Sequence, residues 1–223
     1  MGPWRLLLIM PVPSVAKPTF FTLLTASLDR IFTGNLQAQT MLRVYGNRAL
    51  KTLPGLDTRP TTARVRQAVF NIWQGRIQGC RWLDLCAGCG SMGAEALGRG
   101  AAEVVGIEQG LAACGVVRQN WQKLAQPEQR IRLFRGDVLN QLSRLKGQPF
   151  DLIYLDPPYA SLLYQPVLSQ IAQLGLLQEG GEVAVEHGPQ GWQPGETIPG
   201  LTLIRQKRYG LTHLAFYTRT VTI

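Results

Sequence analysis

Short apolar runs alternate with segments of helical spacing along the chain from Met41 onward. The run 150–155 has the length and composition of a buried strand in a parallel sheet. Val65, Val69 and Ile72 instead recur at helical spacing, behind a threonine (Thr61 or Thr62) that can cap the helix. The predicted strands are 82–86, 104–108, 131–135, 151–155, 182–186, 201–209 and 211–220, and the other predicted helices are 91–99, 111–125, 138–145 and 162–174.

Strands and helices that alternate in this way predict an α/β fold, namely a doubly wound, mostly parallel sheet with an antiparallel edge. The segment 41–53 carries a turn signal at Gly46-Asn47 and predicts a hairpin or extended arm. We therefore expect a basic N-terminal hairpin and helix over 41–76 and a larger α/β domain over 77–223.

The first 40 residues differ from the rest, because no hydrophobic period is sustained there. Their apolar run 6–10 is broken by Pro11 and Pro13 and is too short to span a bilayer. Three interpretations compete: a secretory signal, an organelle transit segment, or sequence upstream of the true start at Met41. We favour the third and expect residues 1–40 to be poorly ordered and outside the fold.

Positive charge is concentrated in one segment. The chain has a formal net charge of +9, and residues 41–76 hold seven basic residues against Asp57 alone. A local basic cluster is typical of proteins that bind a phosphate backbone, although a solvated basic face with no partner is the alternative. The candidate RNA-binding residues in this segment are Arg43, Arg48, Lys51, Arg59, Arg64 and Arg66.

A glycine-rich turn follows the first predicted strand of the larger domain. Gly88, Gly90 and Gly93 would let a ligand approach the backbone closely, and Glu108, at the end of the next strand, can bind ribose hydroxyls. The spacing also fits a dinucleotide site, but two acids favour S-adenosylmethionine. Asp84 is placed to attract a methionine ammonium, and Asp137 follows the third strand, where it can meet an adenine amine. A helix N-cap is the alternative role for each acid.

Asp156-Pro157-Pro158-Tyr159 follows the buried run 150–155, at the edge where open α/β sheets bind ligands. The prolines stiffen the turn and leave its carbonyls free to accept hydrogen bonds. Two acceptors beside an aromatic ring suit a planar base with an exocyclic NH2 group. Acceptors on both amine hydrogens favour a more tetrahedral nitrogen, whose lone pair can attack a methyl group. An ordinary turn at the end of a strand is the alternative.

The combined motifs resemble the class I methyltransferases that modify exocyclic amines. The segments Arg59-Pro60-Thr61, Val65-Arg66 and Phe70-Asn71, with Lys207-Arg208-Tyr209-Gly210, resemble more narrowly the 16S rRNA guanine-N2 methyltransferase family. The resemblance covers about 41–220 and implies a seven-stranded sheet, S-adenosylmethionine as methyl donor and a guanine of small-subunit rRNA as acceptor. It also implies that Thr61, Arg66 and Asn71 help to close the cofactor pocket. The expected cofactor-binding residues are Asp84, Cys86, Gly88, Gly90, Glu108, Asp137 and Thr61, and the expected catalytic residues are Asp156, Pro157, Pro158 and Tyr159.

The sequence departs from this family's pattern at two cysteines and in the leader. Cys86 stands where many methyltransferases have glycine, and Cys89 replaces a small residue. Cys86 and Cys89 form a C-x-x-C pair, but no second pair accompanies it, so we expect no metal. Four cysteines without a disulfide framework favour a reducing cytoplasm. A transit segment in 1–40 would instead place the protein in the plastid stroma.

Three other functions stay open at this point. An NAD-dependent oxidoreductase would use the same glycine turn but not the Asp-Pro-Pro-Tyr turn. A non-catalytic RNA-binding protein would keep only the basic segment, and an adenine-N6 nucleic-acid methyltransferase usually needs an added target-reading region. We expect a monomer that acts on 16S rRNA or the small ribosomal subunit and does not bind a membrane.

Overall fold

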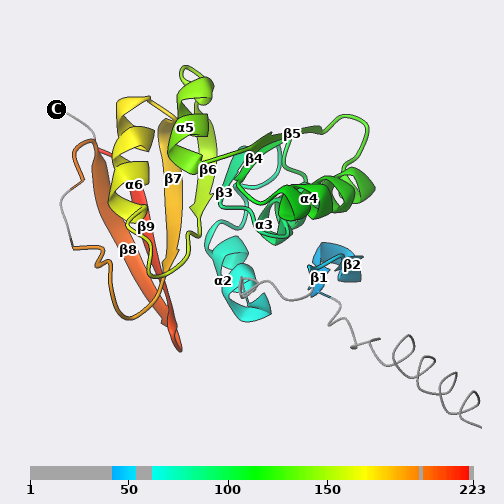
Figure 1. Ribbon diagram of the computed structural model, residues 1–223, viewed down its shortest axis with the longest axis horizontal. Helices are drawn as coiled ribbons and strands as arrows, with labels where there is room; N and C mark the ends of the chain where they lie inside the picture. The colour runs from blue at the N-terminus through cyan, green and yellow to red at the C-terminus, as the bar shows by residue number, and fades with distance from the viewer. Residues whose placement is uncertain (1–41, 54–61, 196–197, 221–223) are drawn as a thin grey trace, which may run out of the picture. The chain divides into compact units, whose positions relative to one another are not determined.

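The computed structural model describes residues 42–53, 62–195 and 198–220 (Figure 1). A seven-stranded sheet has the strand order β5-β4-β3-β6-β7-β9-β8. Its strands β3 to β7 are mutually parallel, and β9 runs antiparallel to both of its neighbours. The strands are β3 (Arg81–Leu85), β4 (Glu103–Glu108), β5 (Arg130–Arg135), β6 (Phe150–Leu155), β7 (Leu177–His187), β8 (Leu201–Tyr209) and β9 (Thr212–Arg219).

Helices cover both faces of this sheet, and each face has its own apolar core (Figure 1). One core joins the sheet to α2 (Ala63–Ile72), α3 (Ser91–Gly98) and α4 (Leu111–Leu124). The other joins it to α5 (Val138–Leu142), the 3-10 turn η2 (Ser143–Leu145) and α6 (Tyr164–Gln173). Because both faces are covered, the central strands are buried along almost their whole length, as the sequence predicted for the run 150–155.

A two-stranded hairpin precedes the sheet. Strands β1 (Leu42–Val44) and β2 (Arg48–Leu50) pair through η1 (Tyr45–Asn47), in which Gly46 and Asn47 adopt positive φ of 68° and 60°. The carboxylate of Glu95 on α3 accepts hydrogen bonds from the Tyr45 N–H (2.8 Å) and from Arg66 Nε (3.3 Å). One buried acid therefore ties the hairpin and α2 to α3.

The predicted fold class is confirmed, and most elements agree within one or two residues. The predicted helix 138–145 instead ends at Leu142 and continues as η2. Strand β7 begins at Leu177 rather than at 182, with an irregularity in its pairing between Phe150 and Leu152. Its polar first residues gave no apolar pattern from which the longer strand could be predicted. The leader 1–40 and residues Arg59 and Thr61 lie outside the described residues, and the domain division at residue 76 stays a prediction.

Candidate functional site

The two predicted chemical motifs lie side by side at one edge of the sheet. β3 and β6 are parallel neighbours in which Leu85 pairs with Leu155, so the turns that follow them emerge together. The Asp156 N–H donates to the Leu85 carbonyl at 3.3 Å. This pairing brings the glycine-rich turn after β3 next to the Asp-Pro-Pro-Tyr turn after β6.

The glycine-rich turn has an unusual backbone held by one carboxylate. Cys86, Gly88 and Gly90 have φ of 61°, 58° and 75°, a region that glycine adopts readily and cysteine rarely. Glu108 at the end of β4 accepts from the Gly88 N–H through one oxygen and from the Gly110 N–H through the other, both at 2.7 Å. Gly88 and Glu108, which were each predicted to bind the cofactor, are therefore in direct contact with one another.

Trp121 of α4 packs against the glycine-rich turn. Its indole N–H donates to the Gly90 carbonyl at 2.8 Å, and the side chain is 1% exposed. A Cβ atom at Gly93 would lie 2.4 Å from the Trp121 ring, and one at Gly106 would lie 2.5 Å from it. The two glycines are therefore required by packing against Trp121, a reason that the sequence pattern alone did not reveal.

Asp84 is the most deeply buried acid of the site. It is 2% exposed and accepts a hydrogen bond from the Gly93 N–H at 2.9 Å. Burial raises its pKa to about 8, and the Gly93 hydrogen bond only partly offsets that effect. Burial therefore favours the protonated form of this carboxyl group near neutral pH.

Four acids converge around the half-buried Cys86. Burial first, and then the carboxylates of Asp156, Glu108, Asp84 and Asp137, raise the pKa of the Cys86 thiol. The thiol therefore stays protonated at neutral pH, which disfavours metal-binding or redox chemistry there. Asp137 also caps α5, accepting from the Asn140 N–H at 3.0 Å through Oδ1, so the N-cap role is confirmed, and cofactor binding through the other oxygen stays a prediction. Acidic side chains grouped in this way suit a cationic ligand.

The Asp-Pro-Pro-Tyr turn is closed by its second proline. The Pro158 carbonyl accepts from the Ser161 N–H at 2.8 Å, so the Pro157 carbonyl is not used for that hydrogen bond. Pro157 is buried, Pro158 is exposed, and Asp156 and Tyr159 are half-buried. Asp156 and Tyr159 thus each keep part of their surface exposed beside the glycine-rich turn.

Tyr159 is held by residues that sequence reasoning missed. Its hydroxyl donates to Glu186 Oε1 at 2.8 Å and lies 3.1 Å from the Thr212 hydroxyl oxygen. Burial, and then the charge of Glu186, raise the pKa of Tyr159, so its proton stays in place at neutral pH. A Cβ at Gly188 would lie 2.8 Å from the ring. These residues follow from the pairing of β7 with β9, which no local motif indicates.

The predicted RNA-binding residues divide into two groups. Arg43, Arg48, Lys51 and Arg64 are exposed, the first three on the hairpin and Arg64 on α2. Arg66 is instead 5% exposed, pairs with Glu95, and donates to the Arg43 carbonyl. It supports the hairpin from within, so four of the five described candidates remain exposed, and Arg59 lies outside the described residues.

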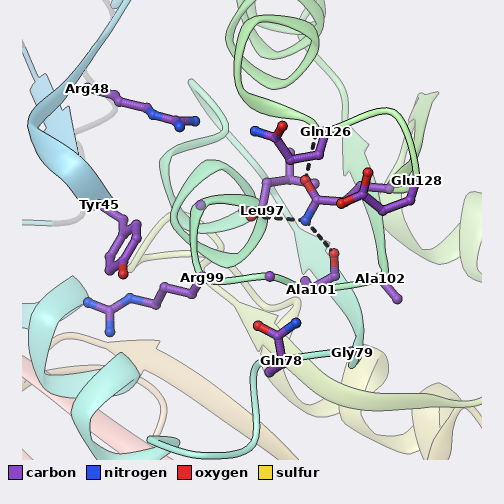
Figure 2. A pocket seen from close by; sticks show the side chains of 13 residues that line it. Tyr45, Arg48, Gln78, Gly79, Leu97, Arg99, Ala101, Ala102, Gln126 and Glu128 are labelled. Carbon is purple, nitrogen blue, oxygen red and sulfur yellow. Dashed lines mark hydrogen bonds between the residues drawn. The ribbon is translucent and has the colours of Figure 1, made fainter.

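A cavity of about 360 Å³ lies away from these acids, between the hairpin and the loops that precede β3, β4 and β5. Figure 2 shows Tyr45, Arg48 and Arg99 on one side of it and Gln126 and Glu128 on the other. These loops precede strands, whereas the two turns of the candidate site follow strands. The cavity and the candidate site therefore lie at opposite ends of the strands. It is not part of the candidate site.

The described residues offer neither a metal site nor a membrane-spanning helix. Within the described ranges, no group of three or more His, Cys, Asp and Glu side chains could hold a metal ion. None of the helices described is long and apolar enough to cross a membrane.

Comparison with known proteins identifies the family. A family model described as "Conserved hypothetical protein 95" matches residues 42–218, which contain both turns and the exposed basic residues. This chain belongs to that family. The match begins with the hairpin and ends in β9, so it spans the whole described sheet.

Several relatives of this chain have names that state a function. Ribosomal RNA small subunit methyltransferase D of Escherichia coli K12 is 31% identical over 167 residues, which are 74% of this chain and 81% of that protein. The protein of the same name from Haemophilus influenzae is 28% identical over 193 residues, covering 85% and 99%. The resemblance to the small-subunit rRNA methyltransferases is thereby confirmed at the level of the family.

Solved structures share the fold. The Escherichia coli protein yhhF superposes with a TM-score of 0.70 at 30% identity, covering 80% of this chain and 98% of that one. TrmN from Thermus thermophilus has a TM-score of 0.55 at 22% identity, over 70% of this chain and 48% of that one, and supports the fold alone. The class I methyltransferase architecture expected from the sequence is therefore confirmed.

Proposed function

We propose that the protein transfers a methyl group from S-adenosylmethionine to the exocyclic N2 amine of a guanine in 16S rRNA. The names of its relatives support ribosomal RNA of the small subunit as the substrate class. The choice of guanine N2 rests on the motif resemblance and on the pair of acceptors at the Asp-Pro-Pro-Tyr turn.

The acidic side chains and the backbone of the glycine-rich turn suit the methyl donor. When bound, S-adenosylmethionine supplies an electrophilic methyl group on a cationic sulfur. Asp84 would attract its ammonium group, Glu108 its ribose hydroxyls and Asp137 its adenine amine. Cys86, Gly88 and Gly90 would line the backbone approach, and Thr61 is carried into the pocket by the family resemblance alone. The four acidic side chains that act electrostatically on Cys86 favour a cationic ligand.

The acceptor base would bind at the neighbouring turn. Asp156 would accept one hydrogen of the guanine amine and the Pro157 carbonyl the other, while Pro158 stiffens the turn and Tyr159 stacks on the base. The amine nitrogen would attack the methyl carbon in line while the bond from that carbon to the donor's sulfur breaks and the sulfur keeps the electron pair. The methylated amine would then pass one proton to water beside the Asp156 carboxylate. Most of the rate enhancement would come from positioning and from stabilising the developing positive charge.

The base must be unpaired or withdrawn from a helix to reach this turn, because a paired amine is inaccessible. Arg43, Arg48, Lys51 and Arg64 would bind the surrounding phosphates. RNA affinity should therefore fall steeply as salt concentration rises, because each phosphate contact releases bound counterions. A nearly flat salt response would count against a role for these residues.

The single observation that carries the proposal is the adjacency of Asp156 to the glycine-rich turn, through the Leu85 carbonyl. Replacement of Asp156 with alanine should lower methyl transfer by about 100-fold or more, while the affinity for S-adenosylmethionine stays nearly unchanged. The assay is methyl transfer from labelled donor to 16S rRNA and to assembled small subunits, with mass spectrometry of the modified nucleoside.

The matched control is Glu179→Ala, which removes an exposed carboxylate on β7. It should methylate as well as the wild type. Recovery of N6-methyladenosine instead of N2-methylguanosine would assign the protein to adenine modification. A fully active Asp156→Ala variant would refute the proposed role of this carboxylate.

A further inference from the structure

The outer strand β8 is strongly basic and solvent-exposed. It forms the last strand of the sheet and pairs with β9. Five consecutive residues, 204–208, are exposed, and they include Arg205, Lys207 and Arg208. The sequence from 198 to 220 has four basic residues and no acidic one. Among the described residues, neither Lys207 nor Arg208 forms an ion pair with an acidic side chain.

The carboxyl end of β8 lies beside the acceptor turn. Tyr209 is the partner of Thr212 in the β8–β9 pairing, and the Thr212 hydroxyl lies 3.1 Å from the Tyr159 hydroxyl. The guanidinium carbon of Arg64 lies 5.9 Å from the centre of the Tyr209 ring. Tyr159, Thr212, Tyr209 and Arg64 thus form a continuous row that leads from the acceptor turn to the basic surface.

The pairing of the strands shows which basic residues share the face of this row. Lys207 is opposite Leu214, which belongs to the same core cluster as α2, and Tyr209 packs against that cluster. Lys207 therefore projects on the α2 side of the sheet, while Arg208 projects on the other side of the same strand. Together they place positive charge on both sides of the strand next to the acceptor site.

We infer that Lys207 and Arg208 form a second RNA-binding surface, which holds phosphates of the nucleotides next to the target guanine. The inference rests on the proposed function, because it assumes an RNA substrate at Tyr159. An RNA strand fits this surface better than an added protein strand, since lysine and arginine on an outer strand oppose pairing with another chain. The hairpin and β8 would then hold the RNA at two separate places.

The test compares the double variant Lys207→Ala/Arg208→Ala with the wild type on 16S rRNA and on assembled small subunits. The KM for the RNA substrate should rise several-fold, while kcat and the affinity for S-adenosylmethionine stay unchanged. Loss of two contacts to single-stranded RNA should also lower the slope of log affinity against log salt by about 1.4. Thermal unfolding checks that the double variant remains folded.

The matched control is Arg130→Ala/Lys146→Ala, which removes two exposed charges near the amino ends of β5 and β6. The inference is overturned if the Lys207/Arg208 variant keeps the wild-type KM and salt slope, or if the control loses as much. It is also overturned if sedimentation shows a wild-type dimer that the variant dissociates, since the surface would then bind protein. A wild-type protein that methylates no rRNA would instead defeat the proposed function itself.

Discussion

Asp84 couples the binding of the methyl donor to pH. Its carboxyl group has a pKa of about 8 because it is buried, so below that pH it must lose a proton before it can attract an ammonium group. Affinity for S-adenosylmethionine should therefore rise about tenfold per pH unit as pH increases toward 8 and then level off. Calorimetric titrations from pH 6 to 9 measure this dependence.

Asp84→Asn provides the comparison for that titration. The amide cannot ionise, so its affinity should be weaker than that of the wild type above pH 8 and nearly independent of pH. A wild-type affinity that does not change between pH 6 and 8 would show that Asp84 is already ionised in the unliganded protein.

The Tyr159 hydroxyl fixes the ring that faces the acceptor base. Tyr159→Phe removes its hydrogen bonds to Glu186 and Thr212 but keeps the ring. Each such bond contributes roughly 0.5–1.5 kcal/mol, so kcat should fall by about tenfold while the affinity for the methyl donor is retained. Single-turnover methyl transfer measures the effect.

Thr212→Val separates the two contacts of Tyr159, because it removes the weaker partner and leaves Glu186 in place. It should slow methyl transfer less than Tyr159→Phe does. The control is Thr202→Val at the other end of β8, where the hydroxyl contacts Thr220 instead. If Thr202→Val slows the reaction as much as Thr212→Val, the effect belongs to the pairing of β8 with β9 and not to the contact with Tyr159.

At the scale of elements, the contact between α3 and α4 depends on Gly93. A methyl group there would lie 2.4 Å from the Trp121 ring and 2.9 Å from Val104, so Gly93→Ala must separate the helix from its neighbours. We expect a loss of about 1–3 kcal/mol in the free energy of unfolding, as for other overpacked cores. Urea denaturation measures it.

Gly115→Ala is the matched control on α4, since nothing lies within 4 Å of a Cβ at that position. Alanine is favoured over glycine in a helix by about 1 kcal/mol, so this variant should be as stable as the wild type or more stable. Equal destabilisation by both substitutions would mean that Trp121 does not press on Gly93.

Local pattern predicted the elements well because both faces of the sheet are covered, which makes strands such as β6 continuous apolar runs. The same patterns selected Asp84, Gly88, Glu108 and Asp156 as candidates, and these residues lie at or near the carboxyl ends of β3, β4 and β6, although their roles stay predictions. They did not reveal Glu186 and Thr212, whose contacts with Tyr159 require knowledge of strand order. They also grouped Arg66 with the exposed arginines, although an amphipathic helix has an inward face on which Arg66 meets Glu95.

At the scale of the whole molecule, Glu95 joins the hairpin to the sheet domain. Glu95 is 5% exposed, and its carboxylate accepts hydrogen bonds from Tyr45, Arg66 and Arg99. Glu95→Ala leaves the Arg66 charge buried without its partner, which costs about 3–5 kcal/mol. We expect lower stability, faster amide exchange over residues 42–53 and weaker RNA binding.

Hydrogen exchange and RNA-binding measurements on Glu95→Ala test this coupling, with the exposed Glu128→Ala as the control. Glu128→Ala should keep the wild-type exchange rates over the hairpin. Unchanged exchange at 42–53 in Glu95→Ala would mean that the hairpin is held by its apolar contacts, such as Val44 and Leu50.

The pairing of β3 with β6 also sets the order in which the candidate site can form. The turn after β3 meets the turn after β6 only when Leu85 lies beside Leu155, and β4 and β5 are made in between. Bringing the ends of such a long segment together lowers the conformational entropy of the chain before stabilising contacts can form. Parallel pairing of this kind therefore slows folding. A nascent chain still short of residue 155 therefore contains the glycine-rich turn but lacks its neighbour, and competence to bind both substrates should appear late during synthesis and refolding.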